Sequence, residues 1–424
     1  MRSLRNRELL NLLAVGLITA VGFASVYVAR ETVVSAASLS YAAFFLALYL
    51  VAHLVLRFAL PHADPYLLPL AALLTAVGLT TIYRIEPERA LRQGVWVVVG
   101  IALFAAAVLV LRDYRKLDDY KYTLGAAAIA LLALPALPGI GATRNGAALW
   151  VELGPIAFQP GELAKVLVVV FLAGYLRDNR ELLSRRIPSP KHFGPLLLVW
   201  GAAMLVLFQT NDLGGGLLYF SVFLAMLYVA TGRWLYVAGG LGLFALGAYG
   251  LYHVVPRVET RVSVWLDPWS DPFGDGYQLV QSIYAISSGG LFGSGLGRGV
   301  LVAPGGSTYI PFLETDFVYS AIAQELGLAG AIAVVLLYVL VAHRGFRIAM
   351  LTDDGFSKLL AAGLTATLGL QAFIIAGGVT GLIPLTGITL PFVSYGGSSL
   401  VANSLLLALL LMVSDRVNRG ELTR

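Results

Sequence analysis

Apolar runs of about 20 residues recur along the whole chain, and this feature constrains the fold more than any other. A helix of that length is what a polypeptide needs to cross the hydrocarbon core of a bilayer. Of the 424 residues, 58% are hydrophobic and only 12% are charged, whereas about 25% of the residues of a soluble domain are charged. The chain therefore lacks the polar surface of a soluble protein, and we expect an integral membrane protein.

The apolar runs predict an all-α polytopic membrane protein with twelve transmembrane helices. The weakest of these spans is the one at 160–176, because Glu162 and Lys165 lie at its start. Abundant glycine, 46 residues in all, suits the close helix packing found in lipid. The predicted spans are residues 9–29, 38–60, 66–83, 94–111, 122–138, 160–176, 193–209, 213–231, 234–253, 317–343, 357–383 and 397–414.

The positions of Lys and Arg predict the orientation of the chain. Cytoplasmic loops of membrane proteins carry an excess of these residues. With the N-terminus inside, most of the 29 Lys and Arg residues fall in inside segments, so both termini are predicted to be cytoplasmic. The formal charge of +5 is mostly this topology signal. No stripe of basic and aromatic residues suggests nucleic-acid binding, and no nucleic-acid partner is expected.

One segment, from about residue 254 to 316, runs without a full span on the predicted outer side. It is rich in Asp, Gly, Pro and aromatic residues. Long loops in compact proteins are usually functional or disordered, and the aromatic content argues against disorder. With no Cys and five scattered His residues, chemistry would come from carboxylates, hydroxyls, cations or a hard metal ion. A site of this kind is expected to face outward.

Charged residues within or beside the predicted spans are the main candidates for function. A charge in hydrocarbon costs about 2.5–3.5 kcal/mol unless it lines a polar cavity. Glu162 and Lys165 are three residues apart and can pair on one helix face, either as a structural pair or as part of a site. Asp212 and Asp316 each precede a span, where a carboxylate can cap the helix or serve a site.

Two further segments carry polar residues with more than one interpretation. The sequence LPFVSYGGSSL at 390–400, with Ser394 and Ser398, could receive an anionic group such as a phosphate or form a re-entrant turn. Asp267, Asp271 and Asp275 in the long loop could bind a hard cation, although turn formation is the more usual role of Asp between Pro and Gly.

In their order along the chain, these motifs resemble those of the SEDS family, the cell-wall polymerases of the RodA/FtsW type. The motifs are FQPGELAK, NDLGG, WLDPWSDPFGDGYQLVQS, SGGLFGSGLGRG, TDF with AQELG, and LPLTGITLPFVSYGGSS. The resemblance implies a ten-helix SEDS core over residues 66–424. Residues 1–65 would be two additional N-terminal transmembrane helices, and the large extracellular loop at about 254–316 would join spans nine and ten.

The resemblance also implies a function. A protein of this family would be a peptidoglycan glycosyltransferase that polymerises lipid II into glycan strands on the outer face of the bacterial cytoplasmic membrane. It would serve an elongation or division complex, in contact with membrane lipid and with a class B penicillin-binding protein as transpeptidase. The family's catalytic carboxylate corresponds to Asp316. The other motif positions are candidate substrate-binding residues: Arg144, Glu162, Lys165, Asp212, Gln278, Gln281, Arg298, Glu325, Ser394 and Ser398.

The implied reaction needs a base and a positive site. The base takes a proton from the acceptor sugar hydroxyl, and positive groups offset the charge that develops on the pyrophosphate leaving group. Asp316 could act as the base or bind Mg²⁺ or Mn²⁺, a divalent cation being the expected cofactor, with metal ligands left open. The candidate cations for pyrophosphate are Arg144, Lys165, Arg257, Arg261 and Arg298.

Two positions depart from the family pattern. The stretch TRNGAALW lacks the Arg that the family usually has just before Trp150, and Arg144 is the candidate substitute. In PFLETDF, Glu314 stands beside Thr315 without the usual His.

A lipid II flippase or a scaffold that recruits the penicillin-binding protein is the alternative to an enzyme. A transporter predicts a cavity near the bilayer midplane, whereas the motifs here lie in the outer loop and at outer helix ends. This placement favours the enzyme.

Overall fold

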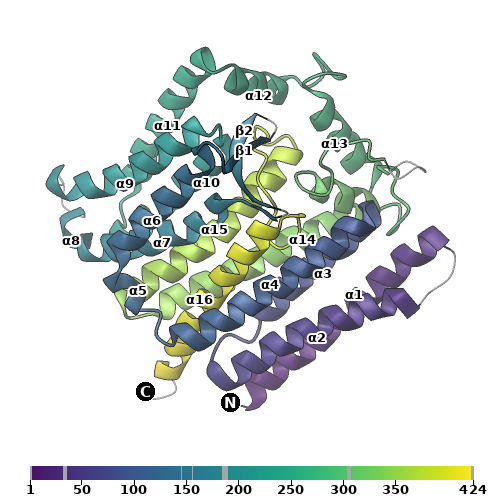
Figure 1. Ribbon diagram of the computed structural model, residues 1–424, viewed down its shortest axis with the longest axis horizontal. Coiled ribbons are helices and arrows are strands. Elements are labelled where there is room, and N and C mark those ends of the chain that lie inside the picture. Colours follow the sequence, from purple (N-terminus) through teal and green to yellow (C-terminus); the bar gives the residue numbers. More distant parts are fainter. Residues whose placement is uncertain are drawn as a thin grey trace.

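The computed structural model describes residues 2–31, 36–144, 146–154, 156–183, 190–302 and 307–421. The chain forms a bundle of long helices (Figure 1). Those that coincide with the twelve predicted spans are α1 (Arg2–Glu31), α2 (Ala36–Ala59), α3 (Leu67–Ile85), α4 (Pro87–Leu111), α6 (Lys121–Ala133), α7 (Pro160–Asp178), α9 (Pro190–Gln209), α10 (Leu213–Thr231), α11 (Trp234–Val254), α14 (Val318–Leu351), α15 (Gly355–Val379) and α16 (Gly397–Glu421). The short helices α5 (Lys116–Asp119) and α8 (Arg180–Leu183) join longer ones.

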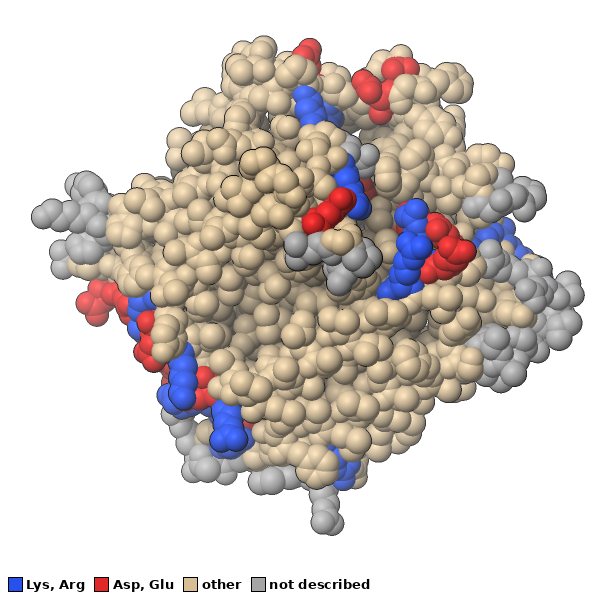
Figure 2. Space-filling view, in the orientation of Figure 1, with Lys and Arg blue, Asp and Glu red and all other residues tan. Residues whose placement is uncertain are grey.

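Most of the helices have the length and composition that a membrane requires. In the described part of the chain, nine of them are long and apolar enough to cross a bilayer, while α6 and α9 contain shorter apolar stretches. Figure 2 shows charged side chains gathered in two bands that are separated by a broad uncharged zone. The predicted all-α membrane fold is confirmed. The number of crossings, twelve, stays a prediction.

A small sheet between α6 and α7 interrupts the helical pattern, and the sequence had not predicted it. Its strands β1 (Gly141–Arg144), β2 (Ala147–Leu153) and β3 (Ile156–Phe158) pair antiparallel in the order β1-β2-β3. The sheet is anchored to the bundle because the Ala148 N–H donates to the Thr210 carbonyl at 3.0 Å.

The predicted loop at about 254–316 contains two helices, α12 (Pro256–Leu266) and α13 (Tyr277–Ser288). Both lie at the same end of the bundle as the sheet, at the top of Figure 1 and away from the two chain termini. We call this end of the molecule the loop end.

The N-terminal helices pack along one edge of the bundle. Helix α1 contacts α2 and α3, and α2 also contacts α4 (Figure 1). The division of the chain into a two-helix extension at 1–65 and a core at 66–424 stays a prediction.

A close backbone contact sets the distance between α3 and the turn that precedes α16. A Cβ on Gly78 of α3 would overlap the carbonyl oxygen of Val393 and would lie 2.6 Å from the Val393 Cα. Helix α3 therefore lies directly against the turn that precedes α16, and only glycine allows this approach.

Gly78→Ala is expected to lower the free energy of unfolding by about 1–3 kcal/mol, because the added methyl group forces two backbones apart. The measurement is the thermal midpoint of the purified protein in detergent. Gly94→Ala in α4 is the matched control, since no atom lies within 4 Å of its Cβ position, and it should not lower the midpoint. Equal midpoints for the two variants would contradict this packing.

Candidate active site

A polar cavity of about 140 Å³ lies at the loop end, between α12, α13 and the start of α14. Its charged and amide side chains are Arg261, Asp275, Gln278 and Asp316. Apolar groups close its other sides. The remaining lining residues are Thr260, Val264, Trp265, Leu279, Phe317, Ile375, Leu385 and Gly387.

Asp316 faces this cavity and does not cap a helix. The N-cap of α14 is Phe317, and no side chain caps that helix, so the helix-cap interpretation of Asp316 is wrong. Loss of solvation raises the pKa of the Asp316 carboxyl to about 6, with Glu314 also raising it, while a hydrogen bond from Thr315 and the positive charge of Arg261 act in the opposite direction.

The segment before α14 is held by residues from distant parts of the chain. The Glu314 carboxylate pairs with Arg89, and the Glu314 carbonyl accepts a hydrogen bond from the Tyr395 N–H at 2.8 Å. The Ser394 hydroxyl donates to the Thr315 carbonyl. These contacts fix the backbone of the two residues just before Asp316.

Helix α12 lines the cavity and supplies the Arg261 cation. The Arg261 Nη1 donates to the Thr386 carbonyl at 3.2 Å, and the Trp265 indole N–H donates to the Gly381 carbonyl at 3.0 Å. Arg257 lies one turn before Arg261 on the same face of the helix. A Cβ on Gly387 would lie 3.7 Å from Asp316 Oδ2 and 3.8 Å from Arg261 Nη2.

The electrostatics of Arg261 show which charges surround it. Burial lowers the pKa of its guanidinium and the Arg257 cation lowers it further, whereas Asp212 and Asp316 raise it. Charges of both signs therefore lie near Arg261. Of the predicted pyrophosphate partners, Arg261 lies in the cavity with Asp316, and Arg257 lies one turn before it on α12.

Glu162 and Lys165 form the ion pair that their spacing predicts. The buried Lys165 Nζ donates to Glu162 Oε2 at 2.6 Å and to Gln371 Oε1 at 2.9 Å. The Gln371 amide in turn donates to the Thr389 carbonyl at 2.8 Å. The pair therefore ties α7 to α15, and its charges are satisfied within the protein. The sequence motifs did not single out Gln371, although a Gln inside an apolar span itself indicates a polar contact within the protein.

Asp212 and the two serines are each hydrogen-bonded to the backbone. The Asp212 carboxylate accepts the Gly215 N–H at 2.7 Å and caps α10, as one interpretation of the sequence predicts. The Ser394 hydroxyl accepts the Leu390 N–H, and the Ser398 hydroxyl accepts the Gln159 N–H, both at 2.9 Å. Ser394 therefore stabilises the turn before α16, whereas Ser398 joins α16 to the start of α7.

The other predicted site residues lie outside the cavity lining. Arg144 stacks over the Trp150 ring at 4.9 Å and pairs with Glu152 at 2.6 Å, so its cation does lie beside the tryptophan. Arg298 is exposed, and Gln281 is on α13 one turn beyond Gln278. Glu325 binds backbone N–H groups of the loop around Gly297.

The carboxylates of the long loop divide into turn formers and a cavity residue. Asp271 accepts the Gly274 N–H at 3.0 Å, and Asp267 accepts the Trp269 N–H at 3.1 Å, so these two stabilise turns. Asp275 lines the cavity. Among the described residues, no group of three or more His, Cys, Asp or Glu could hold a metal ion by itself.

The chain resembles known proteins over most of its length. Residues 52–419 match the family model for FtsW, RodA and SpoVE, described as "Cell cycle protein". The peptidoglycan glycosyltransferase RodA of Mycobacterium tuberculosis is 42% identical over 439 residues, covering 99% of this chain and 92% of the relative.

Solved structures give the same result. One, described as "Structural coordination of polymerization and crosslinking by a peptidoglycan synthase complex", is 30% identical with a TM-score of 0.71, covering 84% of this chain and 98% of its own. The rod shape determining protein RodA of Thermus thermophilus is 28% identical with a TM-score of 0.62, covering 83% of this chain and 96% of its own.

Lys165→Met is expected to lower the free energy of unfolding by about 3–5 kcal/mol, because it leaves the largely buried Glu162 carboxylate without its partner. Thermal unfolding in detergent measures this change. The double variant Glu162→Gln/Lys165→Met should be more stable than Lys165→Met alone, since it removes the unpaired charge. Additive losses in the double variant would contradict a direct pair.

Proposed function

Since the chain belongs to the SEDS family of FtsW, RodA and SpoVE proteins and is a peptidoglycan glycosyltransferase, we propose that it polymerises lipid II with Asp316 as the general base. The observation that carries this proposal is the cavity in which the Asp316 carboxylate faces the Arg261 guanidinium. A glycosyl transfer needs a base for the attacking hydroxyl and a cation for the pyrophosphate leaving group, and this pocket contains one of each.

The Asp316 carboxylate takes the proton of the acceptor sugar hydroxyl as the hydroxyl oxygen attacks the anomeric carbon of the donor. The bond between that carbon and the pyrophosphate oxygen breaks, and the polyprenyl pyrophosphate leaves with the electron pair. A carboxyl group whose pKa is about 6 is mostly ionised at neutral pH. It is also more basic than an ordinary Asp carboxylate, as a general base requires.

The leaving group gains negative charge in this step, and cations aimed at that charge lower the barrier. Arg261 lies in the cavity and Arg257 lies one turn before it on α12. Arg261 donates to the Thr386 carbonyl, so its guanidinium is not held in a close ion pair with Asp316 and stays available to substrate. We assign the pyrophosphate to these two arginines.

A divalent cation fits the same cavity as part of the proposal. Mg²⁺ is usually bound by one or two carboxylates together with substrate phosphates, not by a dedicated protein cage. Asp275, the other carboxylate of the cavity, would hold the ion together with the substrate pyrophosphate, which leaves Asp316 free to act as the base. When bound, it would neutralise charge on the pyrophosphate.

The chain is a multi-pass membrane protein, and we propose that both termini are cytoplasmic and that the loop end faces outward. The excess of Lys and Arg in the predicted inside segments supports this orientation. A class B penicillin-binding protein is the proposed partner, because the structural relative described above belongs to a complex of polymerisation and crosslinking. A flippase would need a midplane cavity, and the cavity found here lies under α12 and α13.

Asp316→Ala and Asp316→Asn are expected to reduce glycan polymerisation by about 10²–10⁴-fold, the usual contribution of general base catalysis. The assay uses the purified chain, lipid II, and Mg²⁺ or Mn²⁺ present or absent, with and without the transpeptidase partner. Asp267→Asn is the matched control, since the side chain of Asp267 stabilises a turn in the same loop and does not line the cavity.

Normal polymerisation by the Asp316 variants would show that the base lies elsewhere. If the wild-type chain makes no glycan even with its partner, the flippase or scaffold interpretation takes the place of the enzyme.

The rate should depend on the ionisation of Asp316. It should fall below about pH 6, where the base becomes protonated. Arg261→Gln removes a cation that lowers the pKa of Asp316, so its acid limb should move to higher pH. Glu314→Gln removes a negative charge that raises this pKa, so its acid limb should move to lower pH. Acid limbs that shift in the same direction would contradict the assignment.

A further inference from the structure

We propose that α1 helps to set the shape of the catalytic cavity by holding the glycine loop, residues 289–301, in place. This loop in turn holds α13 against α14. The proposal rests on the function proposed above, because it takes the Asp316 cavity as the active site. Helix α13 lines that cavity through Gln278 and Leu279, and Asp316 lies at the start of α14. The relative position of these two helices therefore sets the shape of the cavity.

The glycine loop is joined to α14 through the main chain. Helix α14 is broken at Gly327, which has a φ of 67°, and the loop pairs with the backbone on both sides of this break. The bonds run from Ser294 N to the Gln324 carbonyl at 3.1 Å, Gly295 N to the Glu325 carbonyl at 2.9 Å, Leu328 N to the Gly290 carbonyl at 2.9 Å and Ala329 N to the Leu291 carbonyl at 3.1 Å.

An ion pair holds the outer part of the same loop. The Glu325 carboxylate accepts the Gly297 N–H at 2.9 Å and the Gly299 N–H at 3.2 Å. Arg84 of α3 lies 3.2 Å from the Glu325 carboxylate and donates to the Gly299 carbonyl at 2.9 Å. The loop is thus fixed to α3 as well as to α14.

Helix α1 contacts the other side of the loop. A Cβ on Gly297 would lie 2.6 Å from the Ala29 Cβ and 3.3 Å from the Val26 Cα. Glycine is needed there also because the φ of Gly297 is +82°. The Phe23 ring of α1 contacts Tyr83, with ring centres 5.4 Å apart, and Tyr83 precedes Arg84. Helix α1 therefore touches both the loop and the helix turn that binds it.

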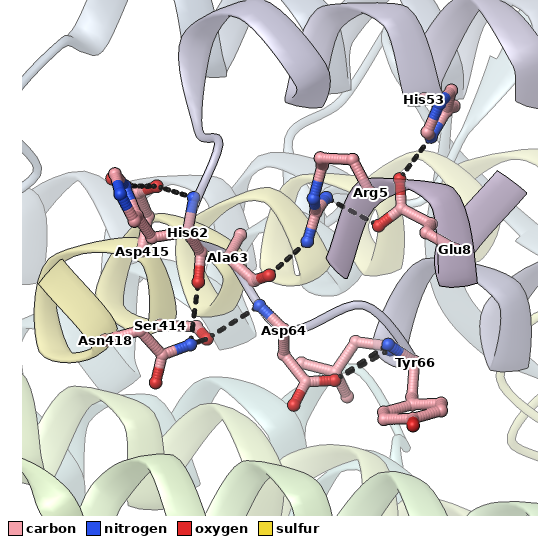
Figure 3. A network of polar contacts seen from close by, with 11 residues as sticks. Arg5, Glu8, His53, His62, Ala63, Asp64, Tyr66, Ser414, Asp415 and Asn418 are labelled. Carbon is pink, nitrogen blue, oxygen red and sulfur yellow. Dashed lines mark hydrogen bonds and ion pairs between the residues drawn. The ribbon is translucent and has the colours of Figure 1, made fainter. Parts of the chain in front are cut away.

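The opposite end of α1 is anchored by buried charges (Figure 3). Glu8 accepts from Arg5 at 2.6 Å and lies 2.6 Å from the Nδ1 of His53 on α2. Arg5 also donates to the Ala63 carbonyl in the connector between α2 and α3. These three side chains are at most 3% exposed.

The connector is bonded to the last helix, which completes the anchor. The Asp64 N–H donates to the Ser414 hydroxyl at 2.9 Å, and the His62 N–H donates to Asp415 at 2.8 Å (Figure 3). Helix α1 is therefore fixed to the bundle at one end, and its other end provides a rigid contact surface for the glycine loop.

The chain contains no Cys, so single thiols can be labelled selectively. The test compares Ala29→Cys with Val28→Cys, both in the full-length protein and both before and after reaction with N-ethylmaleimide. Val28 is the matched control because it is an exposed neighbour on α1 that is not among the atoms nearest to Gly297. Mass spectrometry gives the extent of labelling, and Ala29→Trp and Val28→Trp provide the same added bulk without labelling.

Added bulk at position 29 is expected to lower kcat for lipid II polymerisation about tenfold or more, since a misplacement of about 1 Å can cost 10²-fold in rate. KM should change less than about twofold and the thermal midpoint should not change, because only the loop is displaced. Amides of residues 289–301 should exchange hydrogen about tenfold faster. The same bulk at position 28 should change none of these quantities.

The two proposals fail in different ways. If the wild-type chain makes no glycan, the proposed function is wrong. Hydrogen exchange of the loop then still tests whether α1 holds the loop in place. If labelled Ala29→Cys and Ala29→Trp keep the wild-type kcat and loop exchange, α1 does not position the cavity. A fall in kcat together with a lower thermal midpoint would indicate general destabilisation and would also overturn the proposal.

Discussion

Lipid offers no hydrogen bonds, so each polar group inside a membrane protein has to find its partner within the protein. This constraint explains where the charges of the chain lie. Lys165 is satisfied by Glu162 and Gln371 between two helices, and Glu325 is satisfied by Arg84 and by backbone N–H groups of a loop. Each pair fixes one element to another, and together they hold the loop end in place.

The charges of the cavity are different in kind. Asp316 and Arg261 are close to the same glycine, but the arginine donates to a backbone carbonyl and the aspartate keeps a raised pKa. Burial raises the pKa of Asp316 although the Arg261 cation lowers it, and burial together with a specific charged neighbour perturbs pKa values at functional sites. The ion pairs outside the cavity make the loop end rigid. This rigidity keeps Asp316 and Arg261 close to each other in the cavity.

The sequence predicted the helices well because hydropathy and span length are local properties. It did not predict the sheet at 141–158, whose strands are short and lie in a connection between spans. The spacing of Glu162 and Lys165 predicted their pair, which lies within one helix. The contacts of Glu314 with Arg89 join residues far apart in the chain, and no local pattern reports such a pair. For the same reason, the sequence could name Arg261 as a candidate but could not place it beside Asp316.

The most direct test of the central claim is a structure of the Asp316→Asn variant with lipid II bound in donor and acceptor positions. The account predicts that the attacking hydroxyl of the acceptor lies about 2.6–3.2 Å from the side chain at position 316, the reach of a general base. The donor pyrophosphate should contact Arg257 and Arg261. A substrate whose hydroxyl lies against another carboxylate, with its pyrophosphate away from α12, would contradict the assignment.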